Sequence, residues 1–74
     1  MPETPNIPWN LLKQVVGDAY REFMFMGESK EILLFKHIWT RRYLNVDRSG
    51  NTYRYVGGGY EPISHVESLR DALR

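Results

Sequence analysis

The sequence contains no cysteine, which excludes disulfide bonds, thiolate metal ligands and thiol nucleophiles. A secreted domain of 74 residues would usually need disulfide staples, so this composition favours a cytoplasmic protein. No apolar run approaches the ~18 residues that indicate a membrane-spanning helix, and a membrane partner is not expected. Residues 1–5 have neither a basic start nor an apolar stretch, so we expect no signal peptide.

Motifs of catalysis are equally scarce. The chain has no phosphate loop, no nucleophile elbow and no pair of histidines at helical spacing. Its two histidines, His37 and His65, are too few and too far apart in the sequence for a metal site. The triple glycine at residues 57–59 lacks the following Lys and Ser/Thr of a phosphate loop, and it predicts a hinge. We therefore expect a non-enzymatic binding protein without a cofactor, a metal or a small-molecule substrate.

Length and composition define the domain organisation. The chain is 42% hydrophobic and 26% charged, as in an ordinary globular domain. Three of the four prolines lie in residues 1–8, which predicts a flexible Pro-rich arm because proline fixes φ and has no amide donor. Residues 9–74 are expected to form a single small domain.

The N-terminal half holds one helical pattern with an ambiguous end. Apolar residues recur at spacings of three and four, which predicts a helix that starts at Pro8 in its first position; they are Trp9, Leu12, Val16, Ala19, Phe23 and Met26. This helix could run to Met26 and stop at Gly27. It could equally end near Arg21, with residues 23–26 forming a strand, because aromatic residues favour strands.

The rest of the chain predicts a sheet and a second helix. Ile32–Phe35 is a short apolar run typical of a buried strand. Residues 43–47 and 52–56 are rich in strand-forming residues and flank a Ser-Gly pair, which indicates a hairpin. Residues 60–63 form a connector or a short edge strand. The predicted fold class is α+β, with an N-terminal helix, a three- to four-stranded antiparallel sheet in a meander or hairpin arrangement, and a short C-terminal helix.

The last helix has a clear start signal. Ser64 followed by Glu67 is a capping box, in which each side chain bonds the backbone amide of the other residue. Val66, Leu69 and Leu73 follow at helical spacing and are expected to form the apolar stripe that docks on the sheet.

A hairpin register follows if Ser49 and Gly50 form a two-residue loop. Asn45 then lies opposite Arg54, and alternation assigns every side chain to a face. One face, expected to pack on the core, carries Leu44, Val46, Tyr53 and Tyr55. The other, expected to be exposed, carries Arg41, Tyr43, Asn45, Asp47, Thr52 and Arg54.

Positive charge is concentrated around this hairpin. Residues 36–54 carry five basic residues and one acidic residue, whereas the remaining positions carry five basic and eight acidic residues. Such segregation suits recognition of an anion. The candidate binding residues are Lys36, Trp39, Arg41, Arg42, Tyr43, Asn45, Arg48 and Arg54.

Two function classes fit these candidate binding residues. Arg binds phosphate, Asn pairs with adenine and aromatic rings stack on unpaired bases. These residues therefore predict a regulator of gene expression that binds nucleic acid through a sheet face. The alternative is a protein–protein interaction module, because Arg, Tyr and Trp also dominate protein interfaces. It would act as an inhibitor or adaptor on an acidic surface of a larger machine such as the transcription apparatus. A plain solvated face remains the simplest reading of the same residues.

Overall fold

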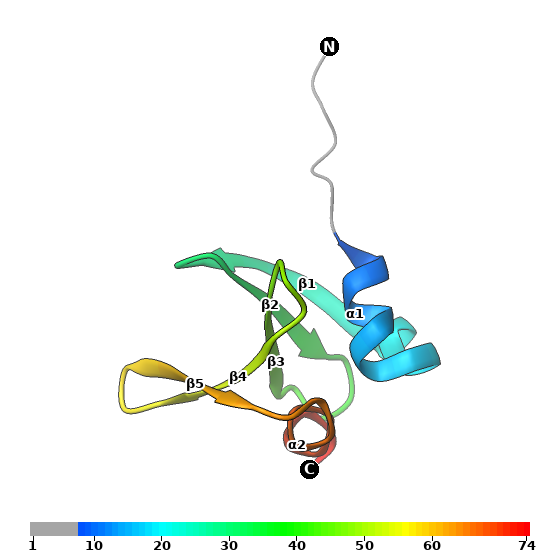
Figure 1. The fold of residues 1–74 in the computed structure, drawn as a ribbon. Helices are drawn as coiled ribbons and strands as arrows, with labels where there is room; N and C mark the ends of the chain where they lie inside the picture. The colour runs from blue at the N-terminus through cyan, green and yellow to red at the C-terminus, as the bar shows by residue number, and fades with distance from the viewer. Residues whose placement is uncertain (1–7) are drawn as a thin grey trace.

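The computed structural model describes residues 8–74, and all but the last residue of the predicted arm lie outside that range (Figure 1). The chain begins with α1 (Trp9–Val16) and a 3₁₀ helix, η1 (Gly17–Glu22), and it ends with α2 (His65–Leu73). Between them lie the strands β1 (Phe23–Ser29), β2 (Ile32–His37), β3 (Tyr43–Asp47), β4 (Thr52–Val56) and β5 (Gly59–Ile63). The α+β class is confirmed, with five strands rather than three or four.

The five strands form one antiparallel meander in the order β1-β2-β3-β4-β5. In Figure 1, α1 and η1 lie beside β1, α2 lies across the end of β3, and the β4–β5 hairpin extends away from the other strands. None of the helices within residues 8–74 is long or apolar enough to cross a bilayer.

The ambiguous segment after α1 is a strand. The α-helix ends at Gly17, whose φ of 65° lies in the left-handed region that favours glycine. Pro8 is the N-cap rather than the first helical residue. The chain then makes a 3₁₀ turn and enters β1 at Phe23. The prediction of one helix to Met26 is therefore wrong, and the alternative with a strand from residue 23 is confirmed.

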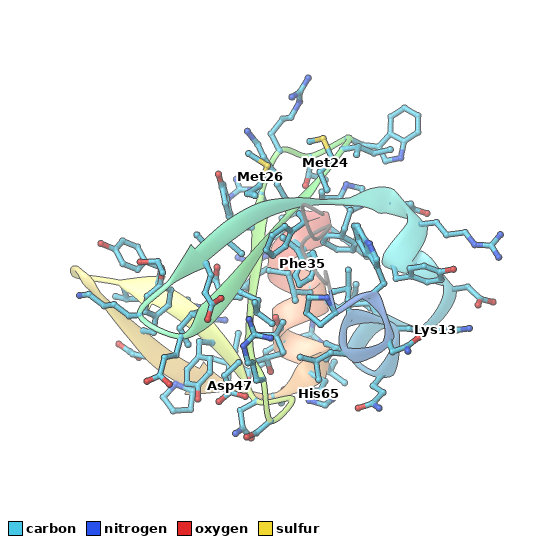
Figure 2. The ribbon with its side chains drawn as sticks, turned by 90° about the horizontal axis from the view of Figure 1, so that it is seen from above. Lys13, Met24, Met26, Phe35, Asp47 and His65 are labelled. Carbon is cyan, nitrogen blue, oxygen red and sulfur yellow. The ribbon has the colours of Figure 1, made fainter. Side chains whose placement is uncertain are left out.

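The core lies between the two α-helices and one face of the sheet. Leu12 and Phe35 are completely buried, and the ring of Phe35 lies 5.5 Å from the rings of both Trp9 and Phe25. The buried cluster consists of Leu12, Val16, Phe23, Leu33, Phe35, Leu44, Val46 and Ala72. Figure 2 shows Phe35 on the helix side of the sheet, with Met24 and Met26 projecting from the other side of β1.

The β3–β4 loop has three residues instead of two. The amide of Asp47 donates to the carbonyl of Asn51 at 2.9 Å, and that of Gly50 donates to the carbonyl of Asp47 at 3.1 Å. Gly50 has a φ of 92°, as in a type I turn followed by a left-handed residue. The Asp47 carboxylate accepts from the amides of Ser49 and Asn51 and holds this loop.

The predicted hairpin register is therefore wrong by one residue. The observed pairs are Asn45 with Tyr53 and Val46 with Thr52. A slip of one residue moves every side chain of a strand to the other face. Tyr53 and Tyr55 consequently share a face with Asn45, whereas Thr52 and Arg54 lie on the helix side.

The C-terminal segment differs from expectation in two ways. Gly57 and Gly58, with φ of 58° and 84°, form the two-residue turn between β4 and β5 rather than a hinge before α2. The capping box of Ser64 and Glu67 is confirmed. However, α2 docks through Ser68 and Ala72, both essentially buried, with Leu69 packed against the core. The predicted apolar stripe is therefore correct for Leu69 and wrong for Val66 and Leu73, which are exposed to solvent.

Gly50→Ala tests the loop geometry. The added Cβ meets only Leu11 Cδ1 at 3.6 Å, an ordinary contact, so the cost comes from forcing an L-residue into left-handed backbone. We expect a loss of about 1–2 kcal/mol in the free energy of unfolding, measured in urea. Gly59→Ala is the matched control, because Gly59 lacks a positive φ and has room for the Cβ. Equal losses in the two variants would contradict the assigned loop.

Candidate functional site

The sheet face opposite the helices is rich in tyrosine. Cross-strand pairing aligns Lys36 with Tyr43, Leu34 with Asn45, Asn45 with Tyr53 and Tyr55 with Tyr60. Because opposed residues in a sheet share a face, these side chains lie on one surface. We call this surface the tyrosine face and define it as Leu34, Lys36, Tyr43, Asn45, Tyr53, Tyr55 and Tyr60.

A hollow of about 410 Å³ opens on the tyrosine face. Tyr55 and Tyr60 form one wall, with their ring centroids 5.1 Å apart in an edge-on arrangement. The β1–β2 turn places Lys30 at the rim, and both turn residues, Lys30 and Glu31, adopt positive φ of 51° and 66°. The complete lining is Ser29, Lys30, Leu34, Tyr43, Asn45, Tyr55 and Tyr60.

The hollow lies where β3 and β4 separate. Within residues 8–74, these two strands pair only at Asn45–Tyr53 and Val46–Thr52. Since bonded pairs alternate along an antiparallel ladder, the next bonded pair would join the backbones of Tyr43 and Tyr55. Their amides and carbonyls instead face the space between the strands. We call this space the β3–β4 split.

A second hollow of about 490 Å³ occupies the β3–β4 split. It shares Tyr43, Asn45 and Tyr55 with the first hollow, so the two are adjacent. The remaining lining residues are mostly charged and come from the β2–β3 loop, β4 and the end of α2; they are Arg41, Arg42, Tyr53, Arg54, Asp71 and Arg74.

Basic side chains lie in and beside the two hollows: Lys30 lines the first, Arg41 and Arg42 line the second, and Lys36 lies beside Tyr43. Lys36 Nζ lies 5.8 Å from the centroid of the Tyr43 ring, in cation–π geometry. Arg42 donates from Nε to the carbonyl of Arg74 at 3.2 Å. Among residues 8–74, no carboxylate forms a salt bridge with Lys30, Lys36, Arg41 or Arg42. The charges of Lys30, Lys36 and Arg41 are therefore available to an anionic ligand, whereas Arg42 also acts on Asp71.

Arg54 does not belong to the tyrosine face. Its Nε lies 2.7 Å from Asp71 Oδ2, and its Nη2 lies 3.8 Å from Glu67 Oε2. The hydrogen bond from Arg54 lowers the pKa of Asp71 below its ordinary value, against the opposing effect of burial. The prediction that Arg54 shares an exposed face with Tyr43 and Asn45 is corrected, because the one-residue shift turns Arg54 toward α2.

Arg48 and Trp39 lie in loops away from the hollow. Arg48 pairs with Glu28 at 2.9 Å, across the ends of the two hairpins. Trp39 is 74% exposed in the β2–β3 loop. His37, which is 2% exposed, organises that loop because its Nδ1 accepts from the amides of Trp39 and Thr40, each at 3.2 Å. Those acceptor bonds place the proton on Nε2, which donates to Glu22 at 2.8 Å.

Sequence reasoning missed Lys30, Tyr53, Tyr55 and Tyr60 as candidates. The signal that identifies the tyrosines was present in the loop, since Asp at the first and Gly at the fourth position of Asp47–Gly50 are typical of a type I turn. Tyr53 also has a structural role, because its hydroxyl donates to Asp47 Oδ2 at 2.6 Å. Burial acts to raise the pKa of Asp47, but this bond and those from Asn51 and Ser49 lower it overall.

No family model, curated protein or solved structure matches this chain.

Asp71→Asn tests the Arg54–Asp71 pair by its pH dependence. Because Arg54 lowers the folded-state pKa of Asp71, the ionised carboxylate stabilises the fold above its unfolded pKa of about 4. That contribution disappears as the pH falls through the lower folded pKa. We therefore expect the wild type to be more stable than the variant at neutral pH, and the difference to shrink toward about pH 2. Urea unfolding at a series of pH values measures this, and a difference independent of pH would contradict the pair.

Proposed function

We propose that this protein binds single-stranded nucleic acid through the tyrosine face. One observation carries the proposal: Tyr43, Tyr55, Tyr60 and Lys30 line a hollow on a sheet face that the helices leave open, and Tyr53 and Lys36 lie on the same face. Aromatic rings stack on bases, and Lys and Arg bind phosphates. Exposed rings favour a single strand, because the bases of a duplex are already stacked on one another. Such binding would suit a regulator of gene expression.

The charge distribution supports the same surface. Lys36, Arg41 and Arg42 border the tyrosine face or the β3–β4 split. On the helix side, Arg54 is neutralised by Asp71 and Glu67. The basic residues of segment 36–54 thus lie on both faces of the sheet. Those without a carboxylate partner lie beside the tyrosines. A phosphate backbone would neutralise them and release counterions.

A protein partner is the second candidate. The specific observation behind it is the exposure of Trp39 (74%), Val66 (65%) and Leu73 (47%), since exposed large apolar residues mark many protein interfaces. These residues lie outside the tyrosine face. In that case the partner would carry an acidic surface, and binding would depend on Trp39 rather than on Tyr43 and Tyr55.

Tyr43→Ala and Tyr55→Ala test the stacking surface. Each should weaken binding of a fluorescent single-stranded oligonucleotide by about 5- to 150-fold in anisotropy titrations, because a base–aromatic stack is lost. Tyr43→Phe and Tyr55→Phe keep the ring and are the matched controls, with near wild-type affinity. The same titrations with DNA and RNA compare the two polymers. Wild-type affinity in both alanine variants would overturn the assignment of this face.

Lys36→Gln tests the electrostatic contribution to oligonucleotide binding. Loss of one phosphate contact should reduce the salt dependence of log K by about 0.7 for a single strand. Arg70→Gln removes one positive charge from the exposed side of α2 and is the matched control, which should leave the slope unchanged. Equal slopes for the wild type and both variants would remove Lys36 from the interface.

A further inference from the structure

Asn45 is an unusual residue at its position. It lies in the middle of β3, between the core residues Leu44 and Val46, and it is only 5% exposed. Its side chain nevertheless points to the tyrosine face, where it lines both hollows. Burial of a polar amide costs free energy unless the amide finds partners, so its bonding requires an explanation.

The orientation of the Asn45 amide is fixed by its one partner. Nδ2 lies 3.3 Å from the carbonyl oxygen of Tyr53, which can only accept a hydrogen bond, so the amide nitrogen must face it. Oδ1 therefore points the other way. Within residues 8–74, Oδ1 accepts no hydrogen bond from another residue, and the one fully buried side-chain polar atom without a partner is Ser68 Oγ. Oδ1 thus keeps contact with the hollows that Asn45 lines.

We propose that the hollow on the tyrosine face receives one unstacked base that carries an exocyclic amino group, and that Asn45 Oδ1 accepts a hydrogen bond from that group. This inference rests on the proposed function and adds the kind of base that the site selects. The volume of about 410 Å³ lies within the range of about 300–1,000 Å³ typical of small-ligand sites. Tyr43 and Tyr55 flank the position with their rings, and Lys30 stands at the rim for the adjoining phosphate.

The low exposure of Asn45 explains why the hollow would prefer a base with an exocyclic amino group. A recessed acceptor is reached best by a donor that projects beyond the edge of the ring, as the amino groups of adenine and cytosine do. Thymine and uracil carry carbonyl oxygens in the corresponding positions. Those oxygens would approach Oδ1 and the neighbouring carbonyl of Tyr53, so two acceptors would face each other without a donor.

The test varies the base and leaves the protein intact. Wild-type protein is titrated with a thymidine oligonucleotide in which one central base is thymine, adenine, cytosine or purine, the last being adenine without its 6-amino group. We expect adenine and cytosine to tighten binding by about three- to tenfold over thymine, in line with one hydrogen bond. Purine should lose that gain although its ring stacks like adenine.

Asn45→Leu supplies the matched variant, since leucine has nearly the same shape and no acceptor. It should lose the preference for adenine over purine and no longer disfavour thymine, because the acceptor at this position is gone. If this variant fails to fold, the comparison of adenine with purine on the wild type decides alone. Equal binding of adenine, purine and thymine would overturn the inference and leave the proposed function standing. Failure to bind any of the four oligonucleotides would overturn both.

Discussion

The geometry of the tyrosine face depends on the three-residue β3–β4 loop, which the backbone bond between Asp47 and Asn51 closes. The Asp47 carboxylate accepts from the amides of Ser49 and Asn51 and from the hydroxyl of Tyr53. These bonds hold a type I turn that only a left-handed residue, Gly50, can complete. Because this loop sets the pairing of β3 with β4, it decides which side chains of β4 meet the helices and which lie on the tyrosine face.

The same hairpin leaves the sheet incomplete. Tyr43 and Tyr55 direct backbone groups into the β3–β4 split, where the ladder would continue in a regular sheet. Unpaired strand edges are a liability for most proteins. Here the separation creates the two hollows and brings rings from three strands around a buried amide, that of Asn45. The arrangement is therefore more easily understood as a binding site than as a way to stabilise so small a fold.

The fold class could be predicted from the sequence because it rests on local signals: helical spacing up to Val16, the apolar run at β2, and the capping box at Ser64. The faces of β4 could not be predicted from alternation alone. Both possible registers place apolar or aromatic residues on each face, and what distinguishes them is the type I turn at Asp47–Gly50 with Gly50 in left-handed backbone. The residues through which α2 docks on the sheet could not be predicted for a related reason. The small residues Ser68 and Ala72 allow the helix to approach the sheet closely, and hydrophobicity does not reveal that preference.

The helix α2 contributes to the site although it lies on the other side of the sheet. Arg54 of β4 binds Asp71, while Thr40 and Arg42 of the β2–β3 loop donate to the carbonyls of Ala72 and Arg74. One helix end thus joins the segments on both sides of the β3–β4 split. A site whose walls are fixed before binding loses less conformational entropy when the ligand arrives. The Arg54–Asp71 pair would then act as a brace that holds β4 in place beside the end of α2.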